Sequence, residues 1–149
     1  MKNFDYKKYV AELTDEELVG EVLSWEFSKN ATEEELLDAI KKNKVSSFFA
    51  HSSYTPEQLA FLRKAIKENS KSPCLITADV ERGPILYPEL KAYHTSMMSL
   101  GAAHDPSLAF EIGKYTARLC RGVGIGLTLS PVMDINYNAN NPVTNTRAA

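Results

Sequence analysis

Charged residues follow two short apolar runs of this chain, and their types and positions are those of a ligand-binding site. The segment CLITADVERGPILY is apolar at first and turns polar at Asp79, Glu81 and Arg82. The segment IGLTLSPVMDINYNANNPVTNTR repeats this arrangement, with an apolar run before Asp134 and an asparagine-rich loop that Arg147 closes. Such bounded apolar runs are typical of buried parallel strands. Because α/β proteins bind ligands at the carboxyl ends of parallel strands, the two clusters predict one shared site.

The carboxylates of these clusters admit a chemical and a structural interpretation. Asp79 and Glu81 share a face if the strand continues, so an acid/base pair is conceivable, but we favour an ion pair of Glu81 with Arg82 or Arg147. We interpret Asp79 as a ligand-binding group, the alternative being a cap for the following turn. Asp134 could line the site, although such a residue more often holds the adjoining loop through hydrogen bonds to the backbone.

The elements that must position these residues carry clear helix-start signals. Two segments have a threonine followed three residues later by glutamate, which is the capping-box pattern, and two others have a cap followed by proline. They are Thr14–Glu17, Thr32–Glu35, Thr55–Gln58 and Asp105–Leu108. Apolar residues at helical spacing follow the last three starts: Leu36, Leu37 and Ile40; Leu59, Leu62 and Ile66; Leu108, Ile112, Tyr115 and Leu119. Each set predicts one apolar helix face.

Short apolar runs lie between these helices. We expect strands at Val22–Phe27, Val45–Ala50, Cys74–Ala78 and Gly126–Val132. The alternation of helix and strand predicts parallel βαβ units, in an open sheet or in part of a barrel. An open doubly wound sheet normally has a glycine-rich phosphate loop after its first strand. Gly122, Gly124 and Gly126 follow a helix instead, which favours a helix end and a tight turn.

Composition and charge exclude several classes of protein. The 149 residues suit one domain, and 44% apolar with 24% charged residues is typical of a globular protein. The net charge of −2 makes nucleic acid and anionic membranes poor partners. The first residues form no signal peptide, which favours the cytoplasm. Cys74 and Cys120 lack metal or redox spacing, so both are expected to be reduced, buried and structural.

Four motifs, in order and at this separation, resemble glycoside hydrolase family 3. The family's Asp-x-Glu-x-Gly segment is matched at Asp79, Glu81 and Gly83, and its Leu-Gly-Ala-Ala helix start is matched by LGAAHDPSLAF. Its next strand end is matched by SPVMDIN, and the closing segment by NPVTNTR. The opening LTDEELVGEVL is similar to the family's first helix.

The resemblance implies a partial (β/α)8 barrel, with about the first four βα units in one incomplete domain over residues 1–149. It implies part of a retaining β-glycosidase that acts on β-N-acetylglucosaminides or β-glucosides, and Arg82 in the motif is similar to N-acetylhexosaminidase-like members. In the family, the residues that match Asp79 and Arg147 bind sugar hydroxyls. Glu81 and Asp134 are further candidates for substrate binding.

The resemblance also implies that this chain lacks the chemistry of hydrolysis. Retention needs a nucleophilic carboxylate and an acid/base. The family's nucleophilic aspartate follows the seventh strand, and its Lys-His…Gly-His segment follows the fifth and sixth. We therefore expect no catalytic residue within this chain, and the stop at Ala149, just after a polar loop, is expected to interrupt the fold. No metal or cofactor is expected.

Other ring-bearing residues are weaker candidates. His51 follows the second strand and could reach the site, whereas His94 and His104 have no metal spacing. Each histidine is interpreted as a loop or surface residue. Trp25 could stack on a sugar, but a core position is the expected one.

Two alternatives remain. A half-barrel exposes two strand edges and could act without catalysis, through dimerisation or complementation with a partner. An unrelated small α/β binding protein is the second, disfavoured by the missing phosphate loop.

Overall fold

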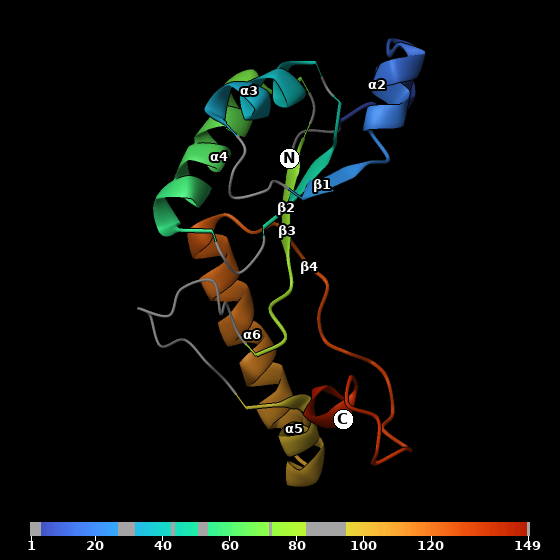
Figure 1. Ribbon diagram of the computed structural model, residues 1–149, viewed down its shortest axis with the longest axis vertical. Coiled ribbons are helices and arrows are strands. Elements are labelled where there is room, and N and C mark those ends of the chain that lie inside the picture. Colours follow the sequence, from blue (N-terminus) through green and yellow to red (C-terminus); the bar gives the residue numbers. More distant parts are fainter. Residues whose placement is uncertain are drawn as a thin grey trace.

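A parallel sheet organises the chain. The computed structural model describes residues 4–26, 32–42, 44–50, 54–71, 73–82 and 95–148. Within them, four parallel strands lie in the order β1-β2-β3-β4 (Figure 1). The strands are β1 (Ser24–Glu26), β2 (Ser47–Phe49), β3 (Leu75–Ala78) and β4 (Leu127–Thr128). The predicted alternation of helix and strand and the parallel sheet are confirmed.

The helices begin where the capping signals predict. They are α1 (Tyr6–Ala11), α2 (Asp15–Gly20), α3 (Glu33–Lys41), α4 (Pro56–Asn69), α5 (Met97–Ala103), α6 (Pro106–Val123) and the 3-10 turn η2 (Asn145–Arg147). Thr14, Thr32 and Thr55 each accept a hydrogen bond from the third backbone N–H of the helix. The side chain at that third position accepts one in return from the threonine backbone. These reciprocal bonds satisfy amides that would otherwise lack partners at the helix start.

Two helices were not predicted as separate elements. Asp5 caps the start of helix α1, and its carboxylate accepts hydrogen bonds from the amides of Lys7 and Lys8. Helix α5 contains the whole LGAA stretch, and its C-cap is His104, which has the left-handed φ of 48°. The chain then starts α6 afresh at Asp105, with Pro106 at the first helical position.

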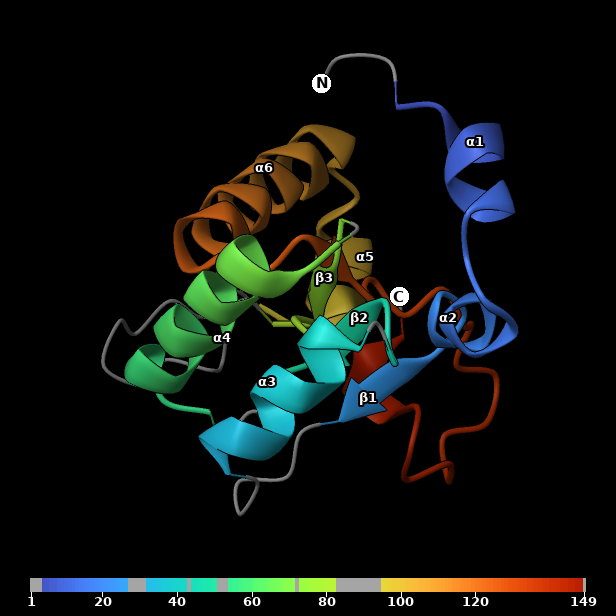
Figure 2. The ribbon, with the colours of Figure 1, turned by 90° about the horizontal axis from the view of Figure 1, so that it is seen from above.

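The core lies between the sheet and the helices that cover one of its faces (Figure 2). Phe48 of β2 is fully buried, and α3 and α4 contribute Ile40, Leu59 and Leu62. The faces predicted for these two helices are thus core faces. The face predicted for α6 is not, since its Leu108 and Tyr115 and most of its other residues remain exposed. Among the described residues, α6 packs on α4 along a short stretch only.

Two sequence expectations about the strands are wrong. The fourth strand is much shorter than Gly126–Val132, because its partner β3 ends at Ala78, which pairs with Thr128. Pro131 then lacks the N–H that a longer ladder needs. Trp25 is 41% exposed and is no core residue, because β1 is an edge strand of the sheet that the structure describes.

The cysteines are free thiols, as expected. Cys120 is buried, whereas Cys74 is only partly buried, which corrects the expectation for that residue. Burial raises the pKa of both thiols, that of Cys74 to about 11. Thiols that stay protonated at neutral pH are poor nucleophiles, so both remain structural.

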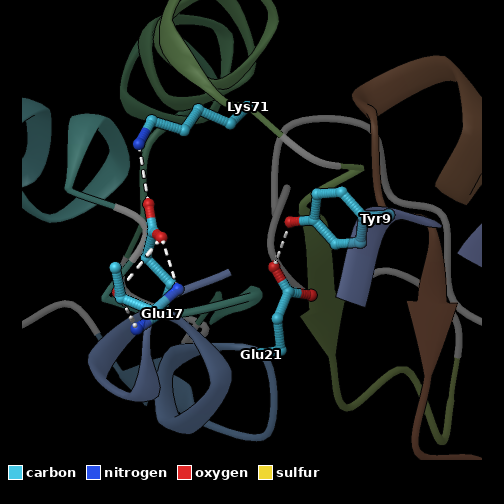
Figure 3. Close-up of polar contacts among 5 residues, drawn as sticks. Tyr9, Glu17, Glu21 and Lys71 are labelled. Carbon is cyan, nitrogen blue, oxygen red and sulfur yellow. Dashed lines mark hydrogen bonds and ion pairs between the residues drawn. The ribbon is translucent and has the colours of Figure 1, made fainter. Parts of the chain in front are cut away.

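Polar contacts join the N-terminal helices to each other and to the segment that precedes β3. Lys71, just before β3, lies 2.7 Å from Glu17 Oε1, and the hydroxyl of Tyr9 donates to Glu21 Oε1 at 2.6 Å (Figure 3). The hydrogen bonds from Lys71 and from Thr14 lower the pKa of Glu17 to about 2. These contacts lie at the amino end of the strands, where α/β barrels place residues that serve stability rather than chemistry. No helix in the described ranges is long and apolar enough to cross a membrane.

Candidate functional site

The loops that follow β3 and β4 meet beyond the carboxyl end of the sheet. The amide of Val80 donates to Ser130 Oγ at 3.2 Å, which ties the start of one loop to the other. Arg82 Nη2 donates to Thr146 Oγ1 at 2.6 Å, which ties the loop after β3 to η2. Helix α5 lies beside η2 at the same end of the molecule (Figure 1). The two polar clusters of the sequence therefore lie together, as their positions after parallel strands predict.

A two-bond ion pair joins Glu81 to Arg147 in this region. Arg147 Nε donates to Glu81 Oε2 at 2.8 Å, and Arg147 Nη2 donates to Glu81 Oε1 at 2.6 Å. The hydrogen bond from Arg147 lowers the pKa of the Glu81 carboxyl, and the same contact raises the pKa of Arg147. The ion pair favoured in the sequence analysis is thus present. An acid/base role for Glu81 has no support, since a general acid near neutral pH needs a raised pKa.

Asp79 and Asp134 lie near this pair without bonding to it. Both carboxylates are exposed, and their charges add to that of Glu81 in raising the pKa of Arg147. Neither makes a hydrogen bond to another residue of the described ranges. The expectation that Asp134 holds its loop through backbone hydrogen bonds is therefore not met. Both carboxylates are available to a ligand beside the guanidinium.

Asparagines hold the loop after β4 instead. Asn138 Oδ1 accepts from the amide of Asn140, and Asn141 Oδ1 accepts from those of Val143 and Thr144. Asn136 Nδ2 donates to the carbonyl of Asn145 at 3.4 Å. These are the turn-forming contacts expected of asparagine. These hydrogen bonds fix the path of the loop that leads into η2 and to Arg147, and none of them involves Glu81.

The histidines add nothing to the site in the described part of the chain. His104 ends α5 on the surface, as expected, while His51 and His94 lie outside the described residues. No cluster of His, Cys, Asp or Glu that could hold a metal ion occurs in the described ranges. The prediction that no metal or cofactor is used remains a prediction.

A cavity of about 480 Å³ lies beside the site. Its walls come from α5, α6 and the ends of β3 and β4, and most of them are apolar. Of the four candidate residues, Glu81 alone borders this cavity. A sugar presents hydroxyl groups on most sides and needs polar partners for them, so the loops around Arg147 suit it better than this cavity does.

The fold and the site together define the class of protein as a parallel α/β domain with its polar groups at the carboxyl ends of the strands. Residues 13–148 match the sequence profile of the glycosyl hydrolase family 3 N terminal domain. The chain belongs to this family, and the resemblance drawn from the four motifs is confirmed.

Known relatives and one solved structure agree with this assignment. A beta-N-acetylglucosaminidase/beta-glucosidase of Cellulomonas fimi is 30% identical over 82 residues, which cover 55% of this chain and 14% of the relative. Beta-hexosaminidase A of Pseudoalteromonas piscicida is 29% identical over 110 residues, which cover 67% of this chain and 18% of the relative. The structure of a family 3 beta-N-acetylglucosaminidase from Paenibacillus sp. str. FPU-7 superposes with a TM-score of 0.72 at 27% identity, over 91% of this chain and 27% of that one. The chain thus spans well under a third of the length of each relative.

Proposed function

We propose that this chain supplies the sugar-binding part of a retaining β-glycosidase site that accepts β-N-acetylglucosaminides or β-glucosides. The observation that carries the proposal is the juxtaposition of Arg147 with two exposed carboxylates, Asp79 and Asp134, at the carboxyl end of the sheet. Support comes from the relatives, whose names give N-acetylglucosaminidase, glucosidase and hexosaminidase activities.

The chemistry of the three side chains fits the hydroxyl groups of a sugar. A carboxylate only accepts hydrogen bonds, so Asp79 can take two from neighbouring hydroxyls. A guanidinium only donates, so Arg147 can serve the lone pairs of the same hydroxyl oxygens. Asp134 adds an acceptor from the other strand-end loop.

We further propose that the 149 residues bind the sugar but do not hydrolyse its glycosidic bond. The reaction needs two catalytic groups, and the family resemblance places the nucleophile beyond this sequence. The purified chain is expected to release no nitrophenol from 4-nitrophenyl N-acetyl-β-D-glucosaminide above the buffer rate. Turnover that copurifies with the chain and is lost in Asp79→Ala would contradict this expectation.

A second candidate function is assembly through the sheet edges. Among the described residues β1 and β4 are the edge strands, and they carry the exposed Trp25 and Leu127, with the exposed Leu129 directly after β4. Unpaired edges of this kind pair readily with another chain, so the chain is a candidate homo-oligomer. Light scattering at micromolar concentration is expected to give a mass of at least twice 16.6 kDa, and a monomeric mass would contradict assembly.

A further inference from the structure

Different contacts hold the backbone and the side chain of Arg147. Its backbone belongs to η2, which Asn136 reaches at Asn145 and Arg82 reaches at Thr146. The next residue, Ala148, is fully buried. The guanidinium, in contrast, is directed by the carboxylate of Glu81. Loss of the Glu81 carboxylate therefore leaves the backbone anchors of η2 in place and removes two of the three hydrogen bonds that hold the head group of Arg147.

The bonds to Glu81 also decide which donors of Arg147 remain for a ligand. A guanidinium has five N–H groups in one plane. Two of them point at Glu81, and Nη1 donates a third to the carbonyl of Val143 at 3.3 Å. One N–H on each terminal nitrogen is left without a partner in the described part of the chain. Two donors on adjacent nitrogens match a pair of neighbouring hydroxyl oxygens.

The environment of the pair favours a fixed geometry. The Glu81 side chain is only 18% exposed, whereas that of Arg147 is 44% exposed. Glu81, which holds the guanidinium, is therefore the more buried partner, and the Arg147 guanidinium is the more exposed one. A two-bond carboxylate–guanidinium contact restricts the rotation of both planes, which a single bond to a point charge does not.

We propose that Glu81 is a positioning residue, which orients the Arg147 guanidinium so that its remaining N–H groups face the hydroxyl groups of a bound sugar. The proposal rests on the proposed sugar-binding function and adds to it a residue that does not itself touch the sugar. Pre-orientation lowers the entropic cost of binding, because the long Arg147 side chain is already fixed before the sugar binds. In this arrangement Glu81 acts only through Arg147.

The test uses Glu81→Gln, which keeps the shape of the side chain but removes its charge. Affinity for N-acetylglucosamine is measured by NMR titration of the 149-residue chain, together with the exchange rate of the Arg147 Nε proton. The variant is expected to bind about tenfold more weakly, as for the loss of a hydrogen bond to a charged group, and to exchange this proton faster. Glu111→Gln is the matched control, since it removes a carboxylate that pairs with Lys114 on the surface of α6. It is expected to keep the wild-type affinity.

A coupling measurement separates positioning from a merely structural role. In an Arg147→Lys background, Glu81→Gln is expected to cause no further loss of affinity, because the two residues act as one unit. An equal loss in both backgrounds, or wild-type affinity in Glu81→Gln, would overturn the proposal. If Glu81→Gln does not fold, Glu81→Asp replaces it, since its side chain is too short to keep both bonds, and wild-type affinity there would overturn the proposal equally. A wild-type chain that binds no sugar would contradict the proposed function, while proton exchange still tests whether Glu81 orients Arg147.

Discussion

Phe48→Ala is expected to lower the free energy of unfolding by about 3–5 kcal/mol. Phe48 lies on β2, between β1 and β3, and its side chain is fully buried. Its removal leaves a cavity among Ile40, Leu59 and Leu62 and their neighbours, which cannot close without moving α3 and α4. Since domains of this size are stable by only about 5–15 kcal/mol, this loss removes at least about a fifth of the stability.

Urea unfolding followed by circular dichroism measures this loss, and Phe110→Ala is the matched control. This control makes the same Phe-to-Ala substitution on α6, where the Phe110 side chain is 69% exposed. The control is expected to change the free energy of unfolding by less than about 1 kcal/mol. Equal losses in the two variants would show that the core does not lie where the structure places it.

Asp79→Asn is expected to weaken N-acetylglucosamine binding by about 10- to 100-fold, as for a hydrogen bond to a charged acceptor. The amide keeps one acceptor oxygen and replaces the other with a donor, so it cannot accept from two neighbouring hydroxyls. Because Asp79 is exposed and makes no hydrogen bond within the described part of the chain, its replacement is expected to leave the fold intact.

Calorimetric titration distinguishes this loss from a general effect of charge. Asp15→Asn removes another exposed carboxylate, from α2, which lies at the opposite end of the molecule (Figure 1). Its affinity for the sugar is expected to equal that of the wild-type chain. If Asp79→Asn also binds as the wild type does, Asp79 is not a sugar ligand.

Local signals made much of the fold predictable. A capping box needs only residues three apart, so Thr14, Thr32 and Thr55 identified three helix starts without knowledge of the rest of the chain. The alternation of elements was enough to predict parallel strands, and parallel strands place Asp79 and Arg147 at one edge. The proximity of these candidate residues was therefore predictable.

Contacts between distant residues were not predictable in the same way. The length of β4 depends on where its neighbour β3 ends, and this cannot be inferred from the apolar run of Gly126–Val132. The burial of Trp25 depends on whether another strand lies beside β1. The choice of Arg147 rather than Arg82 as the partner of Glu81, 66 residues away, depends on the path of the loop after β4. Sequence reasoning also missed the contacts of Arg82 with Thr146 and of Val80 with Ser130, for which no sequence signal exists.

The central claim is that the two strand-end loops form a sugar-binding site, and the backbone amide NMR spectrum tests it most directly. The isotope-labelled chain is titrated with N-acetylglucosamine while every assigned amide is followed. Saturable shifts that are confined to the amides of 79–82 and 134–147 are expected. Saturable shifts centred on α2 or α3, or none at any concentration of the sugar, would contradict this claim.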